Sequence, residues 1–343
     1  MDGGRTGSGL LAEFVRAPIR VLVTGARGQL GRDLQDTLAG RSPAGAPPRS
    51  DEGVEEEILA PIRPGAMDTL ATDVDTLDIT DREAVLAATA AFRPDLVLHG
   101  GAWTAVDACE ADPDHAFAVN ALGTRNVAEA AARIGAHLVY VSTDYVFDGA
   151  SDRPYTEWDP VNPRSVYGRS KLGGEDEARA VSGPSTTVVR TSWVSGAHGA
   201  NMVKTVLRLA RADPTATLRF VDDQHGCPTF TADLAPALIR LGLDRRPGTF
   251  HVTNQGETTW WGLARATLVA AGMDPDRVEP IAAAELDPPR PAPRPANSRL
   301  DNAALRLSGI GLLPKWTESL DRLVRVLSRT EGSGAADART AEA

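Results

Sequence analysis

The sequence has few of the features that mark a secreted, metal-binding or membrane protein. Its 343 residues include two cysteines, Cys109 and Cys227, whose separation fits neither a metal-ligand motif nor a disulfide framework. No apolar run approaches the roughly 20 residues that a membrane-spanning helix needs. The N-terminus also lacks the apolar core of a secretory signal. We therefore expect a soluble, cytoplasmic protein without a membrane partner.

Positive charge is scarce as well. Only 36 Lys and Arg residues stand against 46 Asp and Glu residues, so the formal net charge is −10 at pH 7. Nucleic-acid binding requires clustered Lys and Arg, and we expect no nucleic-acid partner. The length is sufficient for one large domain or two smaller ones with a buried core. An enzyme is the interpretation that these exclusions favour.

Short apolar segments alternate with amphipathic segments along the first half of the chain. Strands are expected at 19–24, near 57–62, and at 95–99, 137–141 and 186–190, with helices at 29–38, 81–92, 116–134 and 170–180. The expected strands are too apolar to face water on either side, which is typical of βαβ units around a parallel sheet. The pattern predicts an α/β fold with a Rossmann-type, doubly wound parallel sheet.

A glycine-rich turn follows directly after the first expected strand. Residues 25–31 read Gly-Ala-Arg-Gly-Gln-Leu-Gly. Such a turn leaves backbone N–H groups free at a helix N-terminus, whose positive end attracts a pyrophosphate. Gly25 would make the tight turn, Gly28 would admit the phosphates, and Gly31 would let the helix pack on the sheet. The position after the first strand favours a dinucleotide site over a plain βα turn.

The choice between NADH and NADPH depends on the end of the second strand. A carboxylate there would bind a ribose 2′-hydroxyl, whereas an arginine would accept a 2′-phosphate. The expected strand end offers Arg63 and no carboxylate, and Arg27 lies within the glycine turn. Both arginines could equally be solvated, so we expect NADPH and leave NADH open. Asp78 and Ile79, expected at the end of the third strand, would contact the adenine.

The second half of the chain continues the alternation more loosely. Further helices are expected at 202–211, 231–243, 260–272 and 315–329, with strands near 218–221 and 249–252 and a proline-rich loop at 286–295. We expect a mainly NAD(P)-binding domain at 19–185 and a smaller, mainly substrate-binding lobe at 186–330, interleaved with the first. Residues 1–18 lack a periodic apolar face, and we expect them and 331–343 to be disordered.

Tyr167 and Lys171 are four residues apart on an expected helix, and so lie on one of its faces. A nearby ammonium lowers the pKa of a phenol, which helps a tyrosine pass a proton to a carbonyl oxygen as hydride reaches the carbon. Ser142, Thr143 and Asp144 follow the expected strand at 137–141, at the sheet edge where open α/β sheets bind ligands. Tyr-x-x-x-Lys alone is a weak signal. Together with the glycine turn and the strand-end hydroxyls it is specific.

These motifs resemble those of the dTDP-4-dehydrorhamnose reductase family, within the extended short-chain dehydrogenases/reductases. The resemblance covers about residues 19–328 and rests on the segments 23–31, 103–107, 119–120, 142–149, 167–171, 190–194, 223–229 and 294–301. It implies hydride transfer from NAD(P)H to the C4 ketone of dTDP-4-dehydro-β-L-rhamnose, which yields dTDP-β-L-rhamnose.

The resemblance also implies roles for individual residues. Tyr167 would donate the proton. Lys171 would lower the pKa of the Tyr167 phenol and hold the nicotinamide ribose, and Thr143 would orient the ketone. Cofactor contacts of the family match Gly28, Gln29, Leu30, Asp78, Ile79, Ala102, Trp103 and Thr104, and its substrate contacts match Thr143, Asp144 and Trp193. Trp193 would stack on the nucleotide sugar or pack in the core. Asn297, Ser298 and Arg299 follow the proline loop, where they would reach a diphosphate or form a surface loop.

Departures from the family pattern concern His99 and a metal. His99 stands where the family usually has Asn, and we interpret it as a strand-end substitution without a catalytic role. Family members that hold a metal at a dimer contact use acidic residues, of which Asp33 is the one plausible counterpart here. We therefore predict no metal, while a homodimer stays possible.

Other functions stay open at this point. A dehydratase of this fold carries Glu directly after the Thr-Asp pair, where this chain has Tyr145. An epimerase would keep its nucleotide tightly bound. Another reductase of the family would act on a different dTDP-4-keto-sugar, such as one that supplies dihydrostreptose. A non-catalytic, dinucleotide-binding regulatory subunit would not need the set Thr143, Tyr167 and Lys171.

Overall fold

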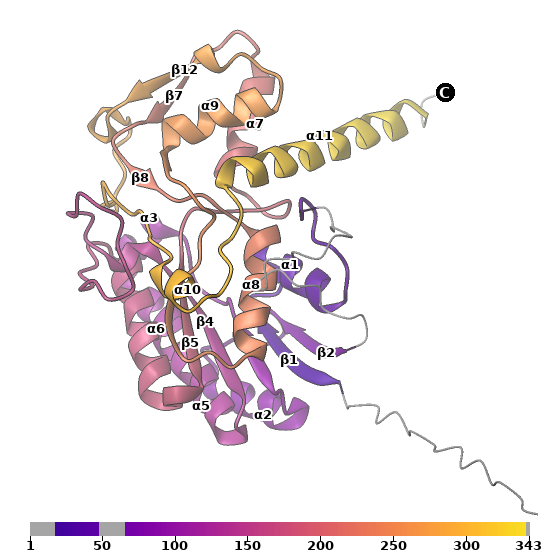
Figure 1. The fold of residues 1–343 in the computed structure, drawn as a ribbon, viewed down its shortest axis with the longest axis vertical. Helices are drawn as coiled ribbons and strands as arrows, with labels where there is room; N and C mark the ends of the chain where they lie inside the picture. Colours follow the sequence, from indigo (N-terminus) through magenta and orange to yellow (C-terminus); the bar gives the residue numbers. More distant parts are fainter. Residues whose placement is uncertain (1–17, 48–65, 341–343) are drawn as a thin grey trace, which may run out of the picture.

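The computed structural model describes residues 18–47 and 66–340, and Figure 1 shows a sheet-based body with a smaller lobe beside it. Six parallel strands form the central sheet in the order β10-β5-β4-β3-β1-β2. Their bounds are Ile19–Thr24 (β1), Met67–Thr72 (β2), Leu96–His99 (β3), His137–Thr143 (β4), Thr186–Thr191 (β5) and Gly248–His251 (β10). The strand order reverses between β1 and β3, where sheets of this kind open a ligand crevice.

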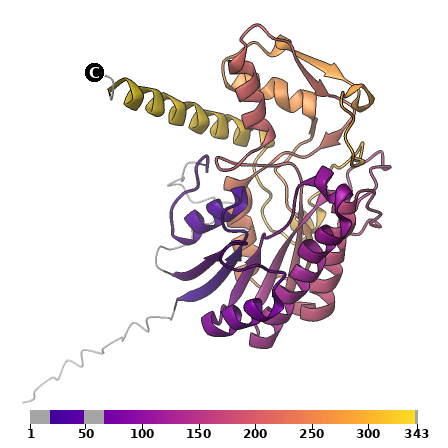
Figure 2. The ribbon, with the colours of Figure 1, turned by 180° about the vertical axis from the view of Figure 1, so that it is seen from behind.

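Helices cover both faces of this sheet because its strands are apolar on both sides (Figure 2). These helices are α1 (Gln29–Leu38), α2 (Arg82–Phe92), α5 (Thr124–Ile134), α6 (Val166–Ser182) and α8 (Thr231–Leu243). Val21 and Val23 of β1 belong to the apolar cluster that includes α1 and α8. Leu22, between them, belongs to the cluster of the opposite face with Val127 of α5. The α/β fold with a doubly wound parallel sheet is confirmed.

The smaller lobe lies on the side of the sheet where the strands end (Figure 1). In the described residues it contains the helices α7 (Met202–Ala212), α9 (Trp260–Ala270) and the first turns of α11 (Trp316–Thr340), and the strand pairs β6 (Val194–Ser195) with β9 (Thr229–Phe230), β7 (Leu218–Val221) with β12 (Val278–Ile281), and β8 (His225–Gly226) with β11 (Thr258–Thr259). The chain enters this lobe after β5, returns to the sheet for α8 and β10, and leaves again. The lobe and the sheet are therefore interleaved.

Shorter elements connect these layers. They are α3 (Val106–Ala111), α4 (Pro113–Phe117), α10 (Ala303–Leu307), the π-helix η2 (Ala118–Gly123), and the 3-10 turns η3 (Asp144–Val146), η4 (Gly183–Ser185), η5 (Pro275–Arg277) and η6 (Ala283–Glu285). The helix expected at 116–134 is thus divided, because η2 interrupts it and buries Asn120 completely. No helix in the described part of the chain is long and apolar enough to cross a membrane.

The second strand of the sheet differs from its expected position. The segment 57–62 lies outside the described residues, and β1 pairs instead with β2 at Met67–Thr72. This strand is half-exposed at the edge of the sheet, so it lacks the apolar run that marks a buried parallel strand. Asp78 and Ile79 consequently follow the turn after β2 and do not close a third strand.

The C-terminal segment also differs from expectation. Helix α11 extends to Thr340, away from the body in Figure 1, so the backbone at 331–340 is helical where we expected disorder. Residues 1–17 and 341–343, which make up almost all of the expected extension and the end of the expected tail, lie outside the described residues.

Candidate active site

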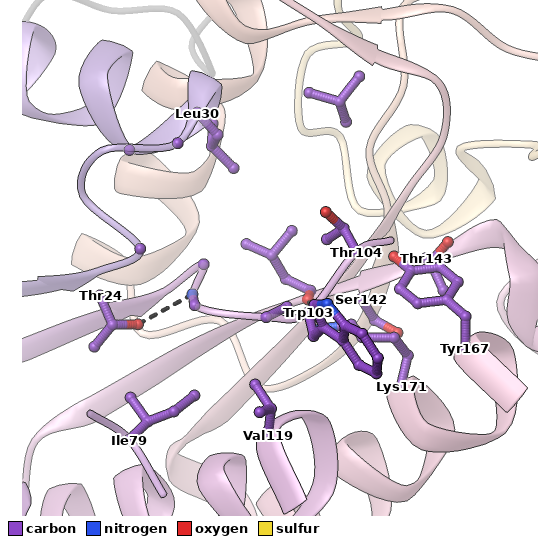
Figure 3. A pocket seen from close by; sticks show the side chains of 18 of the residues that line it. Thr24, Leu30, Ile79, Trp103, Thr104, Val119, Ser142, Thr143, Tyr167 and Lys171 are labelled. Carbon is purple, nitrogen blue, oxygen red and sulfur yellow. Dashed lines mark hydrogen bonds between the residues drawn. The ribbon is translucent and has the colours of Figure 1, made fainter. Parts of the chain in front are cut away.

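A cavity of about 850 Å³ lies where the carboxyl ends of the sheet strands face the lobe. Its wall consists of the glycine turn after β1, the loops after β2 and β3, the ends of β4 and β5, and the start of α6, as Figure 3 shows for part of it. The predicted site residues in this wall are Gly25, Arg27, Gly28, Gln29, Leu30, Gly31, Asp78, Ile79, Ala102, Trp103, Thr104, Thr143, Asp144, Tyr167, Lys171 and Trp193. The predicted cofactor and catalytic residues thus face one shared space.

Two glycines of the turn have no room for a side chain. Gly25 has a φ of +70°, and a Cβ there would lie 2.8 Å from the carbonyl carbon of Gly100. A Cβ on Gly31 would lie 2.1 Å from the carbonyl oxygen of Gly25. No side chain in the described part of the protein caps the N-terminus of α1, and no acidic residue occupies its first turn. This helix end therefore presents main-chain N–H groups and positive potential to the cavity, as a pyrophosphate requires.

A carboxylate does close the second strand of the sheet. Asp73 directly follows β2, and its carboxylate accepts the backbone N–H groups of Arg27 at 2.8 Å and Val74 at 2.9 Å. The guanidinium of Arg27 lies 2.5 Å from Asp75. The expectation that no acidic residue closes this strand was wrong, because the strand was placed too early in the sequence. Arg63, the other half of that argument, lies outside the described residues.

Tyr167 lies in the first turn of α6. This turn is fixed by Ser165, whose side chain accepts the N–H of Gly168 at 3.0 Å, and by Gly168 itself, where a Cβ would lie 2.2 Å from the carbonyl oxygen of Tyr145. Burial raises the pKa of the Tyr167 phenol well above its ordinary value, and a hydrogen bond with Thr143 lowers it only in part. The phenol therefore keeps its proton at neutral pH.

Lys171 lies one turn after Tyr167 and is almost completely buried. Its Nζ donates to the carbonyl of Val141 at 2.7 Å and lies 4.2 Å from the ring centroid of Tyr140. Burial lowers the pKa of Lys171 to about 7, against the opposing effect of Glu175. We expected this ammonium to lower the pKa of the Tyr167 phenol. In the structure burial dominates that phenol instead, and its pKa is raised.

Glu175 is a residue of this region that the motifs did not indicate. It is fully buried one turn beyond Lys171, and it accepts Nε and Nη2 of Arg190 at 2.8 Å each and the hydroxyl of Ser142 at 2.6 Å. Burial, the largest single cause, would raise the pKa of Glu175. The hydrogen bonds from Arg190 and Ser142 and the charges of Arg190 and Arg179 together outweigh burial and hold the pKa below its ordinary value. Its helical spacing from Tyr167 and Lys171 was the available signal.

Asp144 is buried beside Tyr167 and Thr143. It accepts the hydroxyls of Thr143 at 2.9 Å and Ser192 at 3.0 Å. Burial raises its pKa to about 6, although hydrogen bonds from Ser298, Thr143 and Ser192 oppose the change. The end of the cavity near Tyr167 therefore combines a protonated phenol, a hydroxyl and a buried carboxyl group.

Comparisons with known proteins assign this arrangement to a family. The model of the family described as RmlD substrate binding domain matches residues 19–329. The chain belongs to this family. A relative from Streptomyces griseus, named dTDP-4-dehydrorhamnose reductase, is 41% identical over 306 residues, which are 88% of this chain and 91% of the relative. The resemblance predicted from the motifs is thereby confirmed.

Other members of the family match this chain over almost its whole length. A Streptomyces niveus relative named dTDP-4-keto-6-deoxy-D-glucose reductase is 37% identical over 317 residues, 91% of this chain and 99% of the relative. The crystal structure of a Bacillus anthracis dTDP-4-dehydrorhamnose reductase in complex with NADP superposes on this chain with a TM-score of 0.79 at 34% identity. The match covers 90% of this chain and 99% of the B. anthracis chain.

From the sequence, Trp193 would either stack on the nucleotide sugar or pack in the core. In the structure its ring is packed against neighbouring residues. Trp193 has a φ of +48°, and its ring stacks on Trp260 with centroids 3.5 Å apart and planes within 8°. A Cβ on Gly226 would lie 2.3 Å from Cε2 of Trp193, so backbone occupies the other side. Because both ring faces are covered, the cavity meets the edge of Trp193. Trp260, which also lines the cavity, was missed by sequence reasoning.

Asn297, Ser298 and Arg299 do not line the cavity. The Asn297 amide donates to the carbonyls of Ser151 and Arg153 at 2.8 Å. The hydroxyl of Ser298 donates to the carbonyl of His225 at 3.3 Å and also bonds to the buried carboxyl of Asp144. Arg299 pairs with Glu257 at 2.8 Å. These side chains bind neighbouring loops to one another. Their contact with a diphosphate stays a prediction.

Asp33 of α1 has neighbours that the sequence argument about metals did not include. The side chains of Asp36 and His198 lie close to it, with Nε2 of His198 3.8 Å from Oδ1 of Asp33. Asp33 is fully buried, and burial raises its pKa to about 6, although the hydroxyl of Thr231 and the charge of His198 oppose the change. The absence of a metal stays a prediction.

Proposed function

We propose that the protein is an NADPH-dependent reductase that converts dTDP-4-dehydro-β-L-rhamnose to dTDP-β-L-rhamnose, with NADH as a possible second donor. The name of the S. griseus relative and the NADP in the B. anthracis structure support this proposal. The observation that carries it is the contact between Tyr167 and Thr143 in the wall of a cavity whose other end is the glycine turn.

The glycine turn and the loops beside it would hold the dinucleotide. When bound, NADPH supplies the hydride that adds to the C4 carbon of the ketone. The free N–H groups at the start of α1 would bind its pyrophosphate. Asp78 and Ile79 would contact the adenine, while the loop from Ala102 to Thr104 forms the wall between the glycine turn and Tyr167.

Tyr167 would donate the proton to the ketone oxygen. Its raised pKa keeps the phenol protonated at neutral pH, as an acid must be before negative charge develops on that oxygen. Thr143 contacts both Tyr167 and Asp144, so its hydroxyl is placed to orient the same oxygen. Lys171 gives one N–H to Val141, and its remaining N–H groups would bind the ribose of the cofactor.

Turnover with the purified protein tests this proposal. The protein is incubated with dTDP-4-dehydro-β-L-rhamnose and either NADPH or NADH, while the absorbance of the reduced nicotinamide is followed. We expect absorbance loss that depends on the keto-sugar, and a product whose NMR spectrum is that of dTDP-β-L-rhamnose. The free 6-deoxy-4-ketohexose should react far less efficiently, because remote nucleotide binding positions the reacting carbon. Absence of turnover with any dTDP-4-keto-sugar would contradict the proposal.

A second candidate is a reductase for a different dTDP-4-keto-sugar. The S. niveus relative, named for dTDP-4-keto-6-deoxy-D-glucose, matches at 37% against 41% for the S. griseus relative, so identity separates the two substrates poorly. Relative kcat/KM values for the two keto-sugars decide between them. A dehydratase is disfavoured by Tyr145, whose ring lies edge-on to Tyr167 with centroids 5.7 Å apart in the place of an acidic side chain.

Two further alternatives have separate readouts in the same preparation. An epimerase would arrive with stoichiometric bound nucleotide and would return it to its starting redox state. A regulatory subunit would bind the dinucleotide and turn over none of the keto-sugars. The homodimer and the cytoplasmic location expected from the sequence stay predictions, and sedimentation equilibrium tests the first of them.

A further inference from the structure

A buried hydrogen-bond chain runs beneath the cavity through His99, the last residue of β3. In the sheet His99 pairs with Thr24 of β1 on one side and Tyr140 of β4 on the other, and its side chain is fully buried. Its Nδ1 lies 2.6 Å from the hydroxyl of Thr24, and its Nε2 lies 3.1 Å from the hydroxyl of Thr124. The imidazole therefore connects the strand before the glycine turn with helix α5.

The groups at the two ends of this chain fix the direction of every bond. At one end the N–H of Gly101 donates to the hydroxyl oxygen of Thr24 at 3.2 Å, a bond drawn in Figure 3. At the other end the hydroxyl of Thr124 donates to the carbonyl of Asn120 at 2.8 Å. Because the single proton of Thr124 is used on Asn120, Nε2 of His99 must carry the proton given to Thr124. In a neutral ring Nδ1 is then an acceptor, so Thr24 donates its hydroxyl proton to Nδ1. A neutral imidazole protonated on Nε2 satisfies every link.

This chain and Asn120 hold the two ends of one loop. Gly101 stands at the start of the loop that carries Ala102, Trp103 and Thr104. Within the π-helix η2, the Asn120 amide accepts the N–H of Trp103 at 2.8 Å and donates to its carbonyl at 3.1 Å. The same amide donates to Ser170, which lies between Tyr167 and Lys171 on α6, at 2.9 Å. The loop is thus connected to both the sheet and the catalytic helix.

The loop also supports the glycine turn directly. A Cβ on Gly25 would lie 2.8 Å from both the carbonyl carbon of Gly100 and the nitrogen of Gly101. Backbone packs on backbone there, so a small shift of Gly101 changes the shape of the turn that faces the pyrophosphate. Burial, with a contribution from Lys171, lowers the pKa of His99 to about 3, which keeps the ring neutral over the working pH range.

We propose that His99 is a positioning residue for the dinucleotide: it fixes the Gly101–Thr104 loop against the glycine turn, and its loss weakens NADPH binding more than it slows hydride transfer. This inference rests on the NADPH binding of the proposed function. It changes the interpretation of His99 as a simple strand-end substitution. His99 does not line the cavity, and it would act through Thr24 and Gly101.

The test compares His99→Phe with His137→Phe. His137 is the first residue of β4, the strand next to β3, and lies at the amino ends of the strands, away from the cavity. It is also buried, and its ring bonds to Thr187 at 2.7 Å. NADPH dissociation constants are measured by fluorescence titration without substrate, and kcat at saturating NADPH. For His99→Phe we expect the dissociation constant to rise roughly tenfold, with kcat within about threefold of wild type. His137→Phe should keep the wild-type dissociation constant.

Further variants keep the test decisive if His99→Phe fails to fold. Thr24→Val and Thr124→Val each remove one neighbouring link, and should each weaken NADPH binding. His99→Asn retains an acceptor toward Thr24 and should recover part of the affinity lost in His99→Phe. Nitrogen chemical shifts of the histidine rings should show His99 neutral and protonated on Nε2. An imidazolium near neutral pH would overturn the assigned chain of bonds.

The outcomes separate this inference from the proposed function. If wild type binds NADPH and His99→Phe binds it equally well, the inference is wrong and the proposed function stands. The inference is also wrong if His137→Phe weakens binding as much as His99→Phe does. If wild type binds neither NADPH nor NADH, the proposed function and the inference are both overturned.

Discussion

The two ends of the cavity are built from different parts of the chain. At the glycine turn main chain forms part of the surface, because Gly25 and Gly31 leave no room for a Cβ and no side chain among the described residues caps α1. At the end of β4 the surface consists of buried ionisable groups, with the pKa of Tyr167 raised and that of Lys171 lowered to about 7. The first end offers shape and a helix dipole, and the second offers protons.

This difference determines what a substitution does at each end. A new side chain at the glycine turn acts by displacing backbone, so it should change binding of the dinucleotide. Removal of one polar atom at the Tyr167 end takes away a group that can donate a proton and leaves the shape of the cavity intact, so it should change kcat. The predictions below test that division, beginning with the largest effect.

Tyr167→Phe should lower kcat by a factor of ~100 to ~10,000, the usual range for loss of a general acid. The phenylalanine ring still fills the space beside Tyr145 and the cavity wall, so the NADPH dissociation constant should stay near the wild-type value. Lys171→Ala should impair both quantities, because it removes the ammonium and its contact with the ribose. Single-turnover rates measure the chemical step. A near-normal rate for Tyr167→Phe would mean that another group donates the proton.

Gly25→Ala should weaken NADPH binding by roughly tenfold or more. Its φ of +70° strains any side chain, and the added Cβ would also meet Gly100 at 2.8 Å. Gly272→Ala is the matched control, because its φ is +68° and nothing lies within 4 Å of the added Cβ. Both variants should lose stability in thermal unfolding through the strained φ, and Gly25→Ala should lose more because of its backbone clash; NADPH affinity should fall for Gly25→Ala alone. Equal NADPH affinity in the two variants would show that the close backbone contact at Gly25 is unimportant.

How much of this the sequence could predict depends on how local each signal is. The glycine turn, the strand and helix alternation and the Tyr167–Lys171 spacing are contained in short segments, and the family and fold that they imply are confirmed. The buried ion pair of Glu175 could not be predicted in the same way, because Glu175 lies on α6 and its partner Arg190 lies on β5, distant in the sequence. Trp193 is similar, since its covered faces depend on Trp260 and Gly226.

The misplaced second strand shows a further limit. Burial on both faces produces the apolar run by which a parallel strand is found, and β2 at the sheet edge is half-exposed. This error also affected the prediction of the cofactor. With the strand placed too early in the sequence, Asp73 was not recognised as the residue that follows it, where NADH and NADPH are distinguished. Long-range packing, which no local pattern encodes, also raises the pKa of Tyr167 where the nearby Lys171 predicts a decrease.

Asp33 follows the first turn of α1 and does not line the cavity, but it is an ionisable side chain that the fold buries completely. Its pKa is raised by burial from 3.8 to about 6, so the native state binds more protons than the unfolded state between those pH values. The free energy of unfolding attributable to this group therefore falls as pH rises from 3.8 to about 6, and stays low above that range.

Asp33→Asn should escape that loss. With EDTA present, we expect the variant to be more stable than wild type by about 1–3 kcal/mol at alkaline pH, and the difference to disappear in acid. Asp36→Asn makes the same change of charge on the same helix, but Asp36 is half-exposed and paired with Arg41 at 2.6 Å, so it should not stabilise the protein. Chemical denaturation across the pH range measures both. A destabilised Asp33→Asn at alkaline pH would show that the ionised carboxylate has a partner.

The smallest expected effect concerns the choice of nucleotide at the backbone end. Arg27 and Asp73 stand together after β1 and β2, so a partner for a 2′-phosphate and a partner for a 2′-hydroxyl are both present. Arg27 is exposed and its pair with Asp75 contributes little to stability, so Arg27→Ala should leave the fold unchanged. We expect it to raise the KM for NADPH roughly three- to tenfold while that for NADH changes little. Arg41→Ala, which removes the same charge beyond the end of α1, should change neither KM. If Arg27→Ala alters both KM values alike, Arg27 is a surface residue with respect to the 2′ position, and Arg63→Ala becomes the variant that tests the preference for NADPH.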